Sequence, residues 1–212
     1  MSRIVLVRHG ETVWHAENRY AGSSEVELTE RGREQAQALA SWALDARISR
    51  LYVSPSGRAQ MTARPVASAL SLNPVIDVRL RELDFGDAEG LTSQEMRERF
   101  PEQYKAFCRN PVQHHLPGGE DPLAAIARGR ASLDAIAAEA GPSARVLVVT
   151  HKTLIRLLLC DLLGIPPRRY RQVFPSLGNV SITEVVLGGK APALLHFNLL
   201  IAWNSIDVAH IG

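Results

Sequence analysis

Short unbroken runs of apolar residues recur along the chain, separated by longer mixed stretches. The clearest are Ile4–Val7 and Val146–Val149. Runs of this kind are typical of strands that are buried on both faces of a parallel sheet. Four further segments predict strands, the last two antiparallel and near an edge: 48–53, 75–78, 181–187 and 194–197.

Apolar residues at helical spacing fill the stretches between these strands. Thr29 is expected to cap the first helix, whose buried face carries Ala36, Leu39, Ala40 and Ala43. Further helices are predicted at 59–70, 122–140 and 154–163. In the segment 122–140 the inward residues are expected to be Leu123, Ile126, Ala127, Leu133 and Ile136. Strands that alternate with helices indicate an α/β fold with a mostly parallel sheet.

The segment 91–117 has a different character. Prolines interrupt it, and its apolar residues suit short helices with an interior of their own: Met96, Phe100, Tyr104 and Phe107. We interpret this segment as a helical insertion. No repeat, low-complexity segment or linker divides the chain, so residues 1–212 are expected to form a single domain.

The composition argues against several classes of function. A hydrophobic fraction of 46% and a charged fraction of 22% are ordinary for a globular enzyme. The net charge of +2 is too small to indicate binding to nucleic acid or to a membrane surface. Cys108 and Cys160 match no zinc or redox spacing, which favours a reduced, cytoplasmic setting. We expect neither a signal peptide nor a transmembrane helix.

Polar side chains stand where the first strand ends. Arg8, His9 and Gly10 follow it directly, and ligands bind at the carboxyl ends of the strands in open α/β sheets. Arg8 offers a fork of donors that matches a phosphate. His9 can act as a nucleophile near neutral pH, and Gly10 would let the backbone turn sharply and approach a ligand. Taken alone, these residues are equally compatible with a salt-bridged arginine and a surface histidine.

The other strands end in residues of the same kind. His151 follows the second buried run, and Glu82 follows the strand predicted at 75–78. Arg58 lies in the first turn of a helix, where the helix dipole favours an anion. Carboxyl ends of parallel strands share one edge, so these side chains should converge with Arg8 and His9. Such a set suits phosphate chemistry, and its own positive charge makes a metal unnecessary.

Motifs along most of the chain resemble those of the histidine phosphatase superfamily, in the branch related to cofactor-dependent phosphoglycerate mutase. They are LVRHGET at 6–12, ENRYAG at 17–22, LTERGREQA at 28–36, SPSGRAQMTA at 54–63, LRELDFGDAEG at 80–90, PGGE at 117–120 and VVTHKTLIR at 148–156. Each motif alone is weak, but the whole set in this order is specific. The resemblance implies a three-layer αβα sandwich with a mostly parallel central sheet and a short helical insertion.

The resemblance also implies a role for each residue of the set. His9 is expected to take the phosphoryl group, while Arg8, Arg58 and His151 clamp its oxygens. Glu82 is expected to protonate the leaving oxygen and later to activate water. It should reach the pocket from its polar loop without being fixed by regular structure.

Five more residues are expected to contact the substrate. Asn18 and the amide of Gly22 match supporting contacts of the family. His15 stands where family members usually have asparagine, and it either donates to phosphate or points away. Lys152 replaces a glycine and is either a solvated surface charge or an extra cation at the pocket mouth. Thr153 follows it in the chain.

The departures from the mutases favour hydrolysis. The mutase branch has a longer middle segment with paired arginines that grip a substrate carboxylate, whereas the segment here is short and Arg109 stands alone before His114 and His115. We therefore expect a histidine acid-type phosphatase that hydrolyses a small phosphorylated metabolite without cofactor or metal. A mutase-type phosphotransferase and a non-catalytic phosphate-binding protein are the alternatives.

Other conspicuous residues are given no role in the chemistry. His114 and His115 are adjacent, so their side chains diverge, and no third metal ligand is near. Trp203 is expected to contribute to packing. Three arginines are expected to form a solvated basic loop, with contact to an anionic partner as the alternative: Arg168, Arg169 and Arg171. A homodimer is one assembly that the sequence leaves open.

Overall fold

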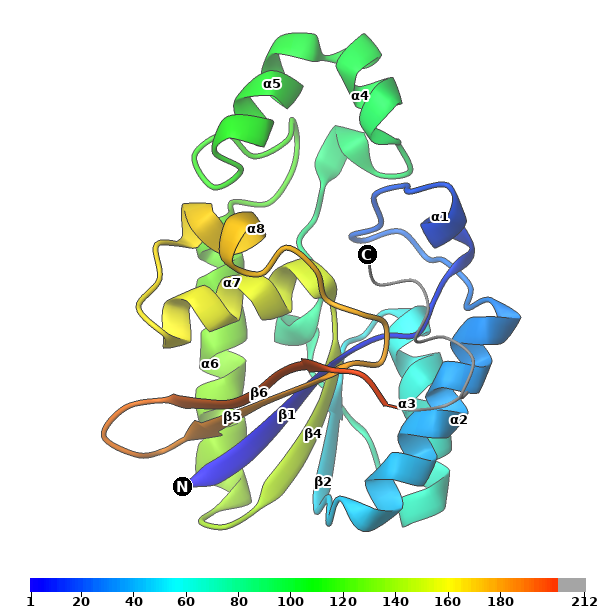
Figure 1. Cartoon of the computed structure of the whole chain (residues 1–212), viewed down its shortest axis with the longest axis vertical. Helices are drawn as coiled ribbons and strands as arrows, with labels where there is room; N and C mark the ends of the chain where they lie inside the picture. Colours follow the sequence, from blue (N-terminus) through cyan, green and yellow to red (C-terminus); the bar gives the residue numbers. More distant parts are fainter. Residues whose placement is uncertain (202–212) are drawn as a thin grey trace.

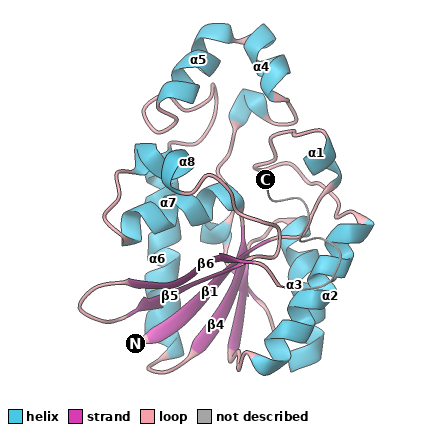
Figure 2. Ribbon diagram, in the orientation of Figure 1, coloured by secondary structure: helices cyan, strands magenta, loops and turns pink. Residues whose placement is uncertain are grey.

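The computed structural model describes residues 1–201, which contain one six-stranded sheet of order β3-β2-β4-β1-β5-β6 (Figure 2). The strands are β1 (Ser2–Arg8), β2 (Arg50–Val53), β3 (Val75–Ile76), β4 (Arg145–Thr150), β5 (Ile182–Leu187) and β6 (Ala193–Leu199). The first four run parallel to one another. At one edge β5 pairs antiparallel with β1, and β6 pairs antiparallel with β5. The predicted mostly parallel sheet is therefore confirmed. Trp203 lies outside the described residues.

Strands β1 and β4 are neighbours at the centre of the sheet. Arg8 and Thr150 are register partners at their carboxyl ends, so the residues that follow, His9 and His151, leave the sheet side by side. The backbone amide of His9 continues the ladder by donating to Thr150 at 3.0 Å. The ring centroids of the two histidines are 5.2 Å apart.

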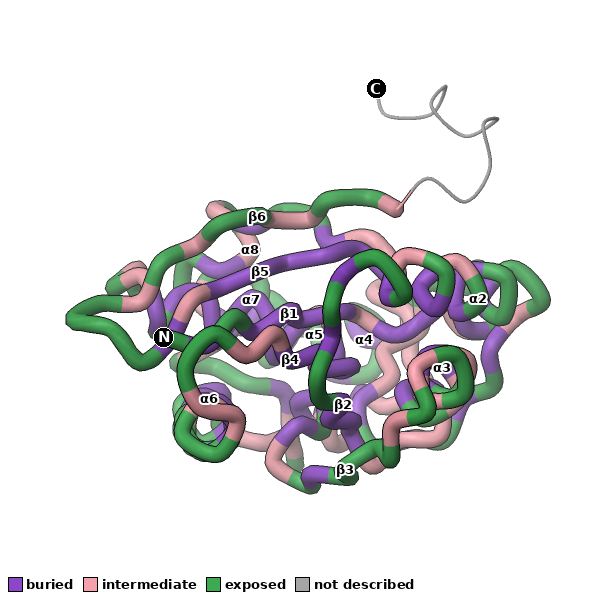
Figure 3. Tube along the Cα trace, turned by 90° about the horizontal axis from the view of Figure 1, so that it is seen from below, coloured by how far each residue is buried: buried purple, intermediate pink, exposed green. Residues whose placement is uncertain are grey.

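Helices cover both faces of the sheet. They are α1 (Val13–Ala16), α2 (Glu30–Asp45), α3 (Gly57–Leu70), α4 (Ser93–Arg99), α5 (Pro101–Arg109), α6 (Pro122–Ala140), α7 (Lys152–Leu162) and α8 (Tyr170–Val173), with short 3-10 turns at Val78–Leu80, Gly86–Ala88 and Pro167–Arg169. Alternate residues of β1 enter different cores: Ile4 and Leu6 join α6 and α7, whereas Val5 and Val7 join α2 and α3. The central strands are consequently buried along their length (Figure 3). This arrangement confirms the predicted three-layer sandwich.

The helical segment α4–α5 projects beyond the carboxyl ends of the strands (Figure 1). Its small core is the one predicted from the sequence, with Met96, Phe100, Tyr104 and Phe107 buried together. Phe85, from the loop after β3, completes that core. The insertion is therefore fixed to the loop that carries Glu82.

Local details differ from the predictions. The strand expected at 75–78 has only two residues, both exposed, because β3 is an edge strand and a 3-10 turn follows. Leu123 and Ala127 of α6 are exposed, since the buried stripe passes through Ala125, Ile126 and Gly129 instead. No helix within the described chain is long and apolar enough to cross a membrane.

Candidate active site

A cavity of about 400 Å³ opens at the carboxyl ends of β1 and β4. Its walls come from β1, α1 and the loop that follows, the loop after β3, the first turns of α7, and α8. Seven of the predicted site residues line it: Arg8, His9, His15, Asn18, Glu82, Lys152 and Thr153. Arg58 and His151 are fully buried around His9. The structure thus brings these residues, which were predicted from the sequence, together at one place.

His9 is buried at the end of β1, and its ring is fixed by the backbone. Its Nδ1 lies 2.8 Å from the carbonyl oxygen of Gly10, an acceptor that requires the proton on Nδ1. Burial, with the charges of Arg58 and Arg8, holds the pKa of His9 well below its usual value. The ring is therefore neutral, and Nε2 carries the free lone pair that a nucleophile needs.

Two buried guanidinium groups provide positive charge next to His9. Arg8 donates to the carbonyl of Leu177 at 2.8 Å and contacts His15 Nε2. Arg58 is completely buried and donates to the carbonyls of the loop at 21–24. Burial lowers the pKa of Arg8 to about 10, so this group stays charged at neutral pH.

His151 ends the β4 strand at the N-cap of α7. Its Nε2 lies 2.7 Å from the hydroxyl oxygen of Ser54, which comes from the end of β2. Burial, followed by the charges of Arg58, Arg128 and Arg8, lowers its pKa well below the usual value. This neutral ring faces the same space as His9.

Unpaired polar atoms concentrate at this site. Within residues 1–201, the buried side-chain atoms without a hydrogen-bond partner are Arg8 Nε, Arg58 Nε, His151 Nδ1 and Arg156 Nε. Buried polar groups are nearly always hydrogen-bonded, and exceptions require an explanation. Four exceptions around one cavity are typical of a site built to bind a polar ligand.

Glu82 is more tightly held than the sequence suggested. Its Oε1 accepts from the amides of Leu83 (2.8 Å) and Leu154 (3.0 Å), and its Oε2 accepts from Thr153 (2.9 Å). The expectation that Glu82 is free of regular structure was wrong, because two of these donors belong to the N-terminus of α7. Oε2 has one protein donor and therefore keeps room for a proton. Among the described residues, Glu82 is the only carboxylate that lines the cavity.

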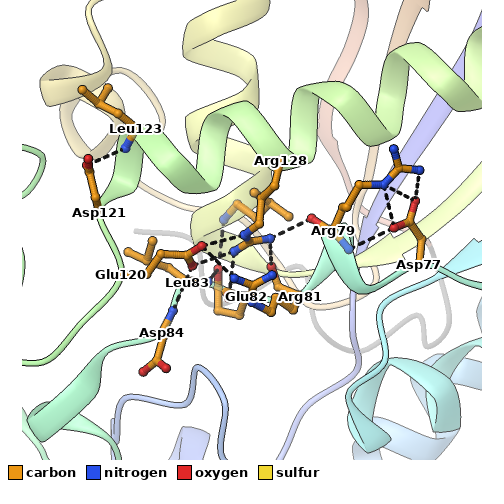
Figure 4. A network of polar contacts seen from close by, with 11 residues as sticks. Asp77, Arg79, Arg81, Glu82, Leu83, Asp84, Glu120, Asp121, Leu123 and Arg128 are labelled. Carbon is orange, nitrogen blue, oxygen red and sulfur yellow. Dashed lines mark hydrogen bonds and ion pairs between the residues drawn. The ribbon is translucent and has the colours of Figure 1, made fainter.

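A second network fixes the loop that carries Glu82 (Figure 4). Arg128 of α6 donates to the carbonyls of Arg79, Arg81 and Glu82 at 2.7, 2.7 and 3.0 Å. It also makes a two-point contact with the Glu120 carboxylate, at 2.7 and 2.8 Å. Although burial alone would raise the pKa of Glu120, the hydrogen bonds from Arg128 lower it, so the pair is ionised. The position of Arg128 was not predicted from the sequence.

Two glycines serve purposes other than those predicted. The amide of Gly22 donates to both carboxylate oxygens of Glu89, at 2.9 and 3.0 Å, so it does not face a phosphate. Its predicted role as a phosphate contact was therefore wrong. A Cβ on Gly10 would lie 2.6 Å from the carbonyl oxygen of Gly32. Gly10 thus permits close packing against α2 rather than close approach of a ligand.

His15 lies inside the cavity and does not point away from it. Its Nδ1 accepts from the Thr12 amide at 2.8 Å, and its Nε2 meets Arg8. Burial, with the nearby charge of Arg8, lowers its pKa to about 4, so the ring is neutral at neutral pH. Asn18 lines the same wall but is exposed, with its backbone in the left-handed region at a φ of 53°.

The structure adds a group of cations and aromatic rings that the sequence analysis did not place in the site. Arg156, Tyr170 and Arg171 line the cavity together with Lys152. Arg171 was expected in a solvated basic loop, and this was wrong: its guanidinium lies 4.3 Å from the ring centroid of Phe107 in α5. One signal was available, because residues 152 and 156 are four apart and share a helix face.

Metal ligands are not clustered in this part of the molecule. Among residues 1–201 no three histidine, cysteine or acidic side chains are grouped so that they could hold a metal ion. The positive charge around His9 comes from arginine side chains instead.

Comparison with known proteins agrees with this geometry. The family model of the histidine phosphatase superfamily (branch 1) matches residues 4–200, so the chain belongs to that superfamily. Phosphoserine phosphatase 1 of Hydrogenobacter thermophilus is 31% identical over 201 residues, 94% of this chain and 93% of its own. A probable phosphoglycerate mutase of Yersinia enterocolitica is 34% identical, over 87% of this chain and 85% of its own.

A solved structure extends the comparison to three dimensions. The α-ribazole phosphatase of Shigella flexneri superposes with a TM-score of 0.81 at 31% identity, covering 92% of this chain and 96% of that one. The fold predicted by resemblance is thereby confirmed. The relatives carry both phosphatase and mutase names, so the family alone does not choose between these two activities.

Proposed function

We propose that this protein hydrolyses the phosphate monoester of a small metabolite through a phosphohistidine at His9, without a metal ion. The observation that carries the proposal is the state of His9. The ring is neutral, its Nδ1 is engaged by Gly10, and Nε2 is free beside Arg8 and Arg58. A loose phosphoryl transfer needs an in-line nucleophile and fixed positive charge, and this arrangement supplies both.

The reaction has two steps that balance. In the first, the Nε2 lone pair of His9 forms a bond to phosphorus while the bond to the leaving oxygen breaks. Glu82 gives its proton to that oxygen, so the product leaves as a neutral alcohol. In the second, the Glu82 carboxylate takes a proton from water, whose oxygen displaces His9 and releases inorganic phosphate. Arg8, Arg58 and His151 hold the phosphoryl oxygens in both steps.

A mutase-type transfer is the second candidate, because several relatives bear that name. It uses the same first step but returns the phosphoryl group to a bound organic acceptor. The short α4–α5 insertion holds Arg97, Arg99 and Arg109, but none of the three lines the cavity, which supports water as the acceptor here.

The test measures phosphate released from a panel of phosphomonoesters in the presence of excess chelator. We expect turnover by the wild-type protein to survive chelation, and His9→Ala to lower it by at least about 10³-fold without unfolding the protein. A second assay follows interconversion of 3- and 2-phosphoglycerate with a bisphosphate primer.

Three results would contradict the proposal. One is near-normal hydrolysis by His9→Ala. Another is activity that disappears with chelator and returns with a divalent ion. Efficient isomerisation that depends on the bisphosphate would instead assign the protein to the mutases.

A further inference from the structure

A second group of cations lies in the cavity beside the proposed phosphate site. It consists of Lys152 and Arg156 on α7 and Arg171 on α8, all of which line the cavity. No carboxylate of the described residues forms an ion pair with any of the three. The charge of Glu82 acts on Lys152 and Arg156, but its oxygens already accept from three backbone amides.

Burial makes this lack of partners costly. Arg156 is only 6% exposed, and its Nε has no hydrogen-bond partner. Lys152 is partly buried, and burial together with Arg8 and Arg156 lowers its pKa to about 8. Buried charges are normally paired or hydrogen-bonded. Cations held this way suit the binding of an anion.

Aromatic rings hold the two guanidinium groups in fixed planes. The ring centroid of Tyr170 lies 4.9 Å from the guanidinium of Arg156 and 5.5 Å from that of Arg171. Arg171 donates through Nε to the Tyr170 hydroxyl at 2.9 Å and lies 4.3 Å from Phe107. These contacts orient the forks without neutralising their charge.

We infer that Lys152, Arg156 and Arg171 bind a second anionic group, carried by the alcohol part of the substrate. The inference rests on the proposed function, because it treats the space beside Arg8 as the phosphate site. The shared chemistry is a carboxylate or a second phosphate, since a guanidinium fork matches either in two-point geometry. A cavity of about 400 Å³ fits a small metabolite that carries two such groups.

The experiment compares pairs of ligands whose two members differ by one anionic group. The first pair is 3-phosphoglycerate and glycerol 3-phosphate, which differ by a carboxylate in place of a hydroxymethyl group. The second is fructose 1,6-bisphosphate and fructose 6-phosphate, which differ by a phosphate. Dissociation constants are measured by calorimetry on the His9→Ala protein, in which hydrolysis cannot obscure binding.

We expect the acidic member of at least one pair to bind about 10- to 100-fold more tightly, the range for a hydrogen-bonded charge. Arg156→Gln and Arg171→Gln should each reduce that ratio about tenfold or more, while Arg171→Lys should retain part of it. Arg169→Gln is the matched control, since Arg169 is exposed and lies outside the cavity. It should leave the ratio unchanged.

The pair that shows the difference identifies the anion as carboxylate or phosphate. Equal binding within both pairs would overturn the inference, as would ratios that survive both glutamine variants. If one variant fails to fold, the other still decides. A protein that discriminates between the members of a pair but never releases phosphate would refute the proposed hydrolysis alone.

Discussion

Glu82 illustrates how much of the proposed chemistry depends on one side chain. Three backbone amides hold its carboxylate at the cavity wall, and no other described acid lines that wall. Such a rigid carboxyl can deliver a proton only to an oxygen placed next to it. Its contribution should therefore depend on how badly the leaving oxygen needs that proton.

We expect Glu82→Gln to slow phosphorylation of His9 selectively. An alkyl alkoxide leaves poorly without a proton, and general acid help is worth ~10²–10⁴-fold, or roughly 3–5 kcal/mol of barrier. p-Nitrophenolate leaves well unprotonated and should lose much less. Glutamine keeps the oxygen that accepts from Leu83 and Leu154, so the fold should survive.

The measurement is the burst of alcohol or phenol release, because Glu82 also acts in the later hydrolysis common to both substrates. Asp84→Asn is the control: this acid is in the same loop but lies outside the cavity lining and accepts from the Gly86 amide. It should leave both bursts unchanged. Equal slowing of the two bursts by Glu82→Gln would remove Glu82 as the leaving-group acid.

The sequence predicted the positions of side chains well where the backbone alone fixes those positions. His9 and His151 each follow a buried strand, so both had to lie at the carboxyl edge of the sheet. Arg171 could not be placed in the same way, because its position depends on α8 contacting Phe107 of the insertion. The contact made by the Gly22 amide could not be predicted either, because it depends on a distant partner, Glu89.

At the scale of elements, α6 holds the loop that carries Glu82 through Arg128. This side chain donates to three carbonyls of that loop, those of Arg79, Arg81 and Glu82. It also binds the Glu120 carboxylate, and nearly nine-tenths of it is buried. We expect Arg128→Gln to destabilise the fold by about 2–4 kcal/mol, as breaking a buried charged network does. Thermal or urea unfolding measures this loss.

A positioning role predicts more than lost stability. Arg128→Gln should also slow the alkyl phosphate burst more than the p-nitrophenyl phosphate burst, repeating the pattern expected for Glu82→Gln. Arg130→Gln provides the control, because Arg130 lies two residues away on α6 and pairs with Asp134 and Asp161 near the surface. If Arg128→Gln slows both bursts equally, Arg128 only stabilises the fold.

Helices and strands could be predicted where the local pattern of apolar residues determines them. The boundaries of α6 match the segment expected from the sequence, and the antiparallel pair β5–β6 lies where two strands were expected, with β6 longer than predicted. The predictions failed where strand pairing or side-chain packing determines the structure. Strand β3 is short because it pairs on one side only. Leu123 is exposed because the buried stripe of α6 is offset by one residue from the predicted stripe.

At the scale of the whole molecule, the cavity gathers positive charge that the composition does not reveal. The net charge is only +2, yet Arg8, Lys152, Arg156 and Arg171 share one cavity with a single described acid, Glu82. The fold stabilises this concentration through the surrounding core rather than through ion pairs. Its electrostatic consequence should appear in the pH dependence of substrate binding.

Lys152 is the member of this group that titrates in an accessible range. Burial, followed by the charges of Arg8 and Arg156, lowers its pKa to about 8, and Arg171 acts in the same direction while Glu82 opposes it. Lys152 is therefore charged below about pH 8 and neutral above it. A bound anion favours the charged form, so binding takes up a proton, and affinity must fall as the pH rises through this range.

We therefore expect the KM for 3-phosphoglycerate to rise about tenfold between pH 7 and 9, close to the effect of losing one charged hydrogen bond. Lys152→Met should start from the higher KM and stay nearly flat. Over this range the substrate is already fully ionised, and Arg8, with a pKa of about 10, remains largely charged. Glycerol 3-phosphate, which lacks the second anion, should show a smaller rise in the wild-type protein. If Lys152→Met shows the same rise as the wild type, a group other than Lys152 controls binding in this pH range.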